Sequence, residues 1–325
     1  MKKVIALLVM AALLLCCFGA VAEATSIAVI YSATIDDKGW CQAMHTGIMN
    51  AIDMGYELDY SYVESVTTTD ITSQIERLVG DYDIIIVHGS QFVNALSSVA
   101  EENPDQVFIV GTSDSVLGDN VFTYMPQSEE PGYLNGIAAG LLSKTGKVGV
   151  VGPADGGDAY RYVRGFVLGY RSVCPDAADP IVSWTGSFGD TVGAGNIAET
   201  MLNSGCDVLT GAAQQAVGAL AKVAGAEGAL WTSQTLSQME DYPEVTVCAA
   251  DYEYSAVIIE ALNYIANGVT GGVNIPMNYS NNGFVFEFSA NESLVPENVR
   301  TAVEAALESF RAAPDTVDYK SVQFN

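Results

Sequence analysis

Basic residues are scarce in this sequence. Its 325 residues include 13 Lys and Arg against 39 Asp and Glu, a formal net charge of −26. Proteins bind nucleic-acid backbones through clustered Lys and Arg, so this charge argues against a nucleic-acid partner. It argues equally against a peripheral protein of anionic membranes. We therefore expect no nucleic-acid partner.

Histidine and paired cysteine motifs are also scarce. His45 and His88 are the two histidines, too few for a His-rich metal site or for most histidine-based catalysis. No Cys-x-x-Cys pair follows residue 24, so we expect no zinc or redox site, no other metal and no cofactor. Four cysteines follow residue 24: Cys41, Cys174, Cys206 and Cys248. An exported chain permits disulfides, but the sequence does not show which cysteines would pair. We expect most of the four to be free and buried.

Apolar runs long enough to span a membrane, about 18 residues, are absent after residue 24. At the start of the chain, the apolar run Val4–Phe18 follows two lysines, and Ala22–Ala24 is an Ala-x-Ala cleavage signal. This pattern predicts a secretory signal peptide at 1–24 and an extracytoplasmic protein. An N-terminal anchor helix is one alternative, and lipid attachment at Cys16 or Cys17 is another.

Strand-like and helix-like patterns alternate along the rest of the chain. Ile84–Val87 is apolar throughout, which is typical of a parallel strand covered by helices on both faces. The alternation begins at Ser26 and restarts after residue 126. Two such series predict an α/β protein with two doubly wound parallel-sheet lobes.

The expected lobe boundaries follow from this alternation. Lobe 1 is predicted to comprise residues 25–125 and 253–270, and lobe 2 residues 126–252 and 271–325. The helix after Asp251 should return to lobe 1. The two lobes should be joined by a hinge of three crossings, near residues 124–128, 251–253 and 268–276.

Candidate ligand-binding residues follow the predicted strands. Open α/β sheets bind ligands beyond the carboxyl ends of their strands, so a cleft between the lobes is the expected site. The polar and aromatic side chains expected there are Asp37, Trp40, His88, Phe92 and Ser113 from lobe 1, and Asp190, Gln214, Trp231 and Asp251 from lobe 2.

The aromatic candidates each have a structural alternative. Trp40 could stack on a flat ligand, which is worth about 1 kcal/mol beyond burial, or it could be a core residue of the first helix. Phe92 has helical spacing with Leu96 and Val99, which favours a core position. Trp231 could form the second face of an aromatic clamp or lie in the core.

The three carboxylates have a shared alternative. Asp37 and Asp190 could accept hydrogen bonds from ligand N–H groups, and Asp251 could hold a ribose hydroxyl or a cationic amine. Each also lies before a predicted helix, where Asp is a favoured N-cap.

Catalytic motifs are incomplete, so we do not expect an enzyme. Gly111–Ser115 resembles a nucleophile elbow but ends in Ser, and both histidines precede it. Cys41 and His45 share a helix face but lack a third partner. The loop Gly152–Gly157 lacks the lysine of a phosphate loop, and the arginines that follow, Arg161 and Arg164, are expected to be solvated.

Several segments resemble the basic membrane protein family, the substrate-binding lipoproteins of ABC importers whose studied members bind purine nucleosides. Ile35–Gln42 is similar to the family's Asp-Asp-Lys-Ser-Phe-Asn-Gln opening, and Val87–Leu96 to its Gly-His-Gly-Phe-Glu-Phe segment. Lys144–Gly149 and Thr185–Asp190 resemble further family segments in the same order, and the resemblance runs from about residue 27 to 267.

The resemblance implies a periplasmic-binding-protein type I fold that closes about a hinge on a flat heteroaromatic ligand, a purine base or nucleoside. It also implies an ABC permease and ATPase complex as partner, with the binding protein itself a monomer. Trp40 replaces the family's Phe, and Asp251 lies where a ribose-contacting Lys is expected. The resemblance therefore supports a role in transport more strongly than it supports a nucleoside as the ligand. A ligand-sensing receptor module remains the alternative.

Overall fold

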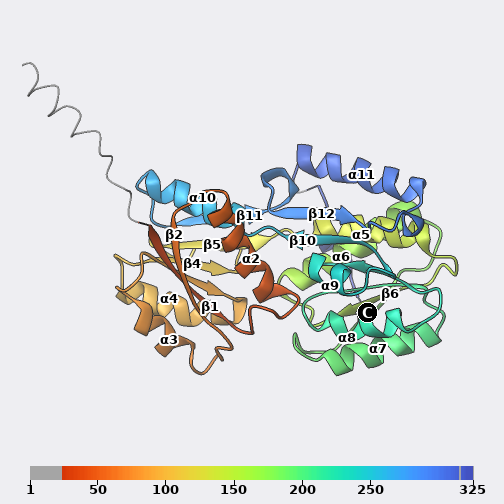
Figure 1. Cartoon of the computed structure of the whole chain (residues 1–325), viewed down its shortest axis with the longest axis horizontal. Helices are drawn as coiled ribbons and strands as arrows, with labels where there is room; N and C mark the ends of the chain where they lie inside the picture. Colours follow the sequence, from red (N-terminus) through yellow and green to blue (C-terminus); the bar gives the residue numbers. More distant parts are fainter. Residues whose placement is uncertain (1–23, 315, 325) are drawn as a thin grey trace, which may run out of the picture.

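The computed structural model describes residues 24–314 and 316–324. The predicted leader, with Cys16 and Cys17, lies outside these residues except for Ala24. Within the described chain there are two six-stranded sheets that lie end to end, each with helices on both faces (Figure 1). We call each sheet with its helices a lobe, and the predicted two-lobed, doubly wound α/β architecture is confirmed.

Lobe 1 is built on a fully parallel sheet of strand order β11-β5-β4-β3-β1-β2. One face carries α2 and α10, and the other carries α3 and α4. Its strands are β1 (Thr25–Tyr31), β2 (Leu58–Val63), β3 (Ile84–His88), β4 (Val107–Gly111), β5 (Val121–Pro126) and β11 (Val273–Met277). Its helices are α2 (Trp40–Asp53), α3 (Ile71–Leu78), α4 (Val93–Glu102) and α10 (Ser255–Ala266).

Lobe 2 has the strand order β12-β10-β9-β8-β6-β7, in which only β12 is antiparallel to its neighbour among the described pairings. Its strands are β6 (Val148–Gly152), β7 (Ile181–Trp184), β8 (Val208–Gly211), β9 (Leu230–Ser233), β10 (Thr246–Tyr252) and β12 (Phe284–Phe288). Its helices are α5 (Glu129–Leu142), α6 (Gly157–Val173), α7 (Thr191–Asn203), α8 (Ala216–Ala224), α9 (Leu236–Asp241) and α11 (Glu297–Ala312).

The hinge consists of three crossings in the described chain. The first follows β5 and the second follows β10, and α10 packs against α2 and β11 of lobe 1. The third differs from the prediction. Strand β11 pairs in parallel with β5 of lobe 1, so the chain crosses at residues 278–283, and the predicted start of lobe 2 at residue 271 is displaced.

Glycines set the close packing of α5 on α6 in lobe 2. A Cβ added at Gly132 would lie 2.1 Å from the carbonyl oxygen of Tyr162, and one added at Gly136 would lie 2.1 Å from that of Phe166. The α6 glycine Gly165 approaches the backbone of Glu129 just as closely. No side chain fits between the two backbones at these points, so the helices form one tightly packed layer.

The described residues allow three further statements. Every helix among them is too short or too polar to cross a membrane. Their His, Cys, Asp and Glu side chains form no group of three that could hold a metal ion. The four cysteines that they include are free thiols; Cys174 is partly exposed and the other three are buried.

Candidate functional site

The two lobes meet where the carboxyl ends of their strands face one another. Trp40, at the start of α2 in lobe 1, makes an edge contact of 5.4 Å between ring centroids with Tyr252, the last residue of β10 in lobe 2. Beside it, a Cβ added at Gly39 would lie 3.0 Å from Gln214, which precedes α8. We call this region the lobe boundary. It is where the expected ligand site lies.

Trp40 is held by His88, the last residue of β3. The two rings are stacked, with centroids 4.5 Å apart and planes 14° apart. Nε2 of His88 lies 2.9 Å from the carbonyl oxygen of Trp40, and Nδ1 lies 2.5 Å from the hydroxyl of Tyr124. A carbonyl oxygen only accepts, so Nε2 carries the hydrogen and Nδ1 accepts from Tyr124. Burial lowers the pKa of His88 to about 3, so the ring is neutral near pH 7.

Tyrosines and a buried carboxyl form the inner part of the boundary. The hydroxyl of Tyr252 donates to Asp158 and accepts from Nε2 of Gln234 at 2.7 Å. Burial raises the pKa of the Asp158 carboxyl. The ring of Tyr254 packs edge-on against Trp40, and its buried hydroxyl has no hydrogen-bond partner among the described residues. A buried hydroxyl without a partner is costly, so a water or a ligand atom would be favoured beside it.

The predicted carboxylates mostly bind backbone amides. Asp37 accepts from the amides of Gly39, Cys41 and Gln42 at 3.0–3.1 Å and so caps the start of α2. Asp190 is the N-cap of α7 and accepts from the amide of Gly193 at 2.8 Å. For these two residues, the structure shows the capping role that the sequence left open.

Asp251, on strand β10, also binds backbone. Its carboxylate accepts from the amide of Leu236 at 2.8 Å and from that of Tyr252 at 2.8 Å. Burial raises the pKa of Asp251 to about 7. It therefore supports the start of α9, and it does not cap the helix after it, as the sequence alternative had suggested.

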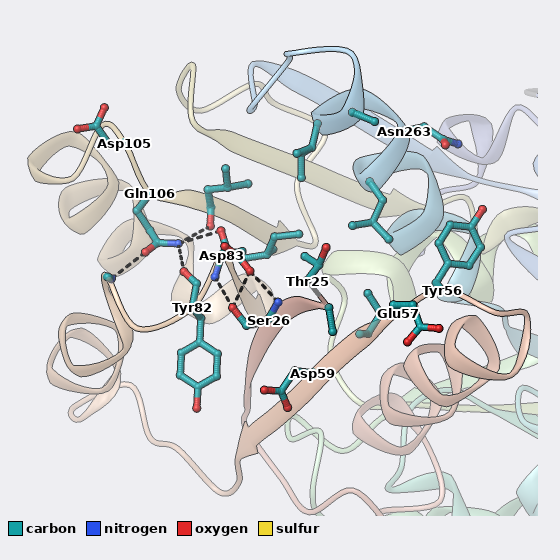
Figure 2. Close-up of a pocket in the computed structure, with 18 of the residues that line it drawn as sticks. Thr25, Ser26, Tyr56, Glu57, Asp59, Tyr82, Asp83, Asp105, Gln106 and Asn263 are labelled. Atoms are coloured by element: carbon teal, nitrogen blue, oxygen red, sulfur yellow. Dashed lines mark hydrogen bonds between the residues drawn. The ribbon is translucent and has the colours of Figure 1, made fainter. Parts of the chain in front are cut away.

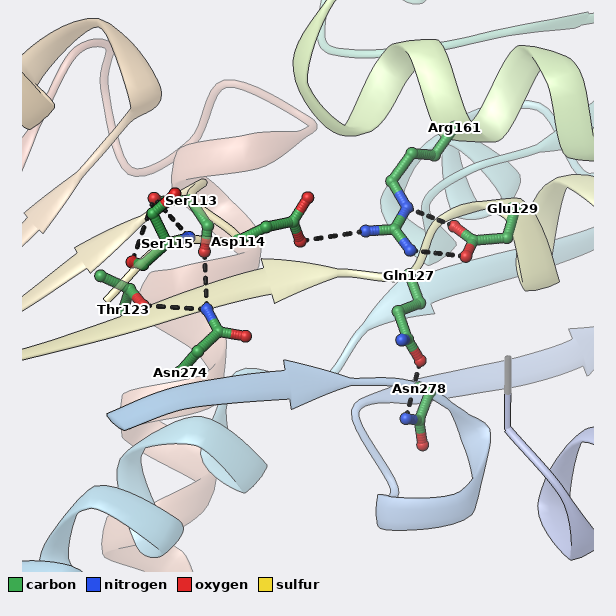
Figure 3. Close-up of polar contacts among 9 residues, drawn as sticks. All are labelled: Ser113, Asp114, Ser115, Thr123, Gln127, Glu129, Arg161, Asn274 and Asn278. Atoms are coloured by element: carbon green, nitrogen blue, oxygen red, sulfur yellow. Dashed lines mark hydrogen bonds and ion pairs between the residues drawn. The ribbon is translucent and has the colours of Figure 1, made fainter. Parts of the chain in front are cut away.

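The other four candidates divide between cores and surface. Phe92 and Trp231 are fully buried in the cores of lobe 1 and lobe 2, so we do not retain them as ligand contacts. Ser113 is partly exposed after β4, and its carbonyl oxygen accepts from Nδ2 of Asn274 at 2.7 Å (Figure 3). Gln214 is partly exposed at the boundary. The structure therefore leaves Trp40 and Gln214 partly exposed at the expected site, with the fully buried His88 packed against Trp40.

Two polar contacts across the boundary were missed by sequence reasoning. The backbone carbonyl oxygen of Lys38 accepts hydrogen bonds from the side chains of Thr235 and Gln238 in lobe 2. The side-chain Nζ of Lys38 lies 3.1 Å from the carboxylate of Asp241. Lys38 belongs to the recognised Asp-Asp-Lys segment, which was the one available signal. The second contact joins Arg161 to Asp114 and contradicts the expectation that Arg161 and Arg164 are solvated, because both are buried.

A broad hollow of about 1250 Å³ lies elsewhere, at the amino ends of the lobe 1 strands (Figure 2). Ser26 and Asp83 bridge neighbouring strands there, with Oγ donating to the carboxylate at 2.7 Å. The exposed carboxylates of Glu57, Asp59 and Asp105 line the same hollow. Parallel sheets bind ligands at their carboxyl ends, so this hollow is at the opposite edge from the expected site.

A comparison with known families decides the assignment. Residues 24–276 match the family described as ABC transporter substrate-binding protein PnrA-like. The chain belongs to this family. The predicted resemblance is thereby confirmed.

Individual relatives have different ligands in their names. A Haloferax volcanii protein named for glucose binding in an ABC transporter is 31% identical over 213 residues, 65% of this chain and 53% of that protein. An ABC transporter nucleoside-binding protein of Lactococcus lactis subsp. cremoris is 32% identical over 153 residues, 46% of this chain and 43% of the relative. The matches thus span about half the length of these curated relatives.

A solved structure supports the fold. An ABC transporter solute-binding protein from Conexibacter woesei superimposes with a TM-score of 0.74 at 22% identity, covering 89% of this chain and 97% of that one. The likeness confirms the periplasmic-binding-protein type I architecture.

Proposed function

We propose that this chain binds a small flat heteroaromatic molecule, a purine base or nucleoside, between its lobes and delivers it to an ABC permease and ATPase complex outside the cytoplasm. The observation that carries the proposal is the position of Trp40. It is partly exposed and contacts residues of both lobes, at the carboxyl ends of the strands where ligands of such sheets bind. The nucleoside-binding relative supports the same ligand class.

Binding by closure follows from the arrangement of these residues. Gln214 belongs to lobe 2, whereas Trp40 and Ser113 belong to lobe 1, so a ligand that contacts all three must join the lobes. Such a ligand has a higher affinity for the closed form and shifts the population toward it. We propose that the protein acts as a monomer.

The charges near the boundary favour a neutral or cationic ligand. Lys38 is paired with Asp241 and Arg161 with Glu129, so both cationic groups already have carboxylate partners. The net charge of −26 adds a long-range repulsion for anions. We therefore expect nucleotides to bind less tightly than nucleosides. Asp251, with its raised pKa, is the group whose charge would matter most to a cationic amine.

The test begins with mass spectrometry of small molecules released from the purified protein. Calorimetry on the stripped protein would then compare adenosine, guanosine, adenine and glucose, glucose being included because of the Haloferax relative. Trp40→Phe keeps an aromatic face and should retain most of the affinity, whereas Trp40→Ala should lose about fivefold, from the stacking energy of about 1 kcal/mol. Tyr82→Ala, a partly exposed aromatic at the amino ends of the lobe 1 strands, is the control and should leave affinity unchanged.

Two results would contradict this proposal. Binding of glucose but of no purine would assign a different ligand class. Equal affinities for the Trp40→Ala and wild-type proteins would remove the stacking role.

A further inference from the structure

Arg161, on α6 of lobe 2, lies between carboxylates of the two lobes (Figure 3). Its Nε and Nη2 donate to both oxygens of Glu129 at 2.5 and 2.6 Å, a bidentate pair that fixes the plane of the guanidinium. The remaining arm, Nη1, lies 3.4 Å from Asp114 of lobe 1. This last contact joins protein groups only, so it contributes to closure whatever the ligand is.

The C-terminal segment, residues 316–324, packs beside this arginine. The guanidinium carbon of Arg161 lies over the ring of Tyr319, 4.8 Å from the ring centroid. The ring thus contacts the guanidinium, whose N–H groups bind the carboxylates. Together with Asp114, Glu129 and Arg161, Thr316–Lys320 lines a hollow of about 500 Å³. The segment therefore borders the one place where Arg161 reaches across to lobe 1.

The same segment is fixed to lobe 2 at its far end. Nε of Arg164 donates to the carbonyl oxygen of Val322 at 3.1 Å, and its guanidinium lies 4.6 Å from the ring of Phe324. Phe324 also packs edge-on against Trp184 at 5.9 Å. These contacts hold the segment on α6 and β7. The segment lies beyond residues 24–276, the part of the chain that the family model matches.

We propose that the C-terminal segment is part of the closure machinery and that Tyr319 is a positioning residue for the cross-lobe contact between Arg161 and Asp114. Glu129 binds Nε and Nη2 of Arg161, and the ring of Tyr319 packs against the guanidinium and restricts its rotation. Less rotamer freedom is then lost when Nη1 meets Asp114 on closure. The inference rests on the proposed hinge closure, but its test does not require the ligand to be known.

The test measures the ratio of closed to open molecules by single-molecule energy transfer in the full mature chain without added ligand. Dyes would be placed at Glu76 on α3 and at Glu227 beyond α8, exposed positions in opposite lobes. Asp114 is 67% exposed, so Asp114→Asn removes the cross-lobe charge with little risk to folding. We expect it to lower the ratio by about two- to fivefold, the range for an exposed ion pair.

Tyr319→Ala should lower the ratio in the wild-type protein but leave it unchanged in the Asp114→Asn background, because positioning matters only while the carboxylate is present. Tyr319→Phe, which keeps the ring, should match wild type. An equal effect of Tyr319→Ala in both backgrounds would show a purely structural role and overturn the proposal. An unchanged ratio in Asp114→Asn or in Tyr319→Ala would overturn it as well. Failure to bind purines would refute the proposed ligand and leave these ratios unaffected.

Discussion

Trp40 and His88 are joined by two contacts, a ring stack and a hydrogen bond. Their rings stack with centroids 4.5 Å apart, and the backbone carbonyl of Trp40 accepts a hydrogen bond from Nε2 of the same imidazole at 2.9 Å. The stack fixes the indole plane, and the hydrogen bond fixes the start of α2 relative to the end of β3. Trp40 is therefore oriented by lobe 1 before any ligand arrives, which lowers the entropic cost of binding.

Replacing His88 should weaken both this orientation and the fold. His88→Ala removes the stack and leaves the buried hydroxyl of Tyr124 without its acceptor. We expect a loss of about 2–4 kcal/mol in the free energy of unfolding, from the cavity, the stack and the unpaired hydroxyl. Urea denaturation would measure it. His45→Ala, at a partly exposed position on α2, is the control, and an equal loss there would contradict the assignment.

His88 should remain neutral in acid. Burial holds its folded pKa at about 3, below the ordinary value of about 6.5. Between these values the unfolded chain binds a proton that the folded chain does not, so His88 should lower the free energy of unfolding as the pH falls from 6.5 toward 3. Nitrogen-15 NMR of the imidazoles would check this. A His88 signal that titrates near pH 6.5 would contradict the buried neutral ring.

Asp251 should act on stability in the opposite direction. Its pKa is raised to about 7 in the fold, so the folded chain holds its proton where the unfolded chain has released it. Its contribution to stability is therefore full below the ordinary pKa of about 4 and is lost as the pH rises through 7. Asp251→Asn should flatten the stability profile between these values. Profiles that remain parallel for the variant and wild type would show that Asp251 has an ordinary pKa.

The packing of α5 on α6 predicts an unusually sensitive glycine. Gly136→Ala would place a methyl group 2.1 Å from the carbonyl oxygen of Phe166, so the helices must separate. We expect a loss of about 1–3 kcal/mol in the free energy of unfolding, typical of overpacking. Gly189→Ala, at an exposed loop position where no atom lies within 4 Å of the added Cβ, is the matched control and should be close to neutral. Thermal denaturation of both variants would compare them, and equal melting temperatures would refute the close packing.

Much of the fold could be predicted because its signals are local. The apolar run Ile84–Val87 became the fully buried strand β3, and the helix after Asp251 returned to lobe 1 as α10. Strand β11 was missed because Pro276 and the preceding glycines weaken its β pattern. Proline is tolerated in edge strands, and β11 lies at the edge of its sheet, so only the tertiary context reveals it.

The candidate site was less predictable, because an aspartate before a helix can either bind a ligand or cap the helix. Asp37 was recognised as a ligand contact or a helix cap, and only the positions of three backbone amides show the cap. Arg161 gave no local signal of burial. Its environment is made by Glu129 and Tyr319, which are distant in the sequence, and by Asp114 from the other lobe.

The pairing of β11 with β5 has a consequence for how the protein is made. Lobe 1 needs β11 and α10 to complete its sheet and to cover one face, and both are synthesised after β6–β10 of lobe 2. Domains generally fold as units from the N-terminus during synthesis, but here the first lobe to emerge from the ribosome cannot be completed until most of the second has been made. Residues 25–126 should therefore remain incomplete, with one sheet edge and the part of one face that α10 covers exposed, until Met277 has been translated, and chaperones would encounter that lobe first.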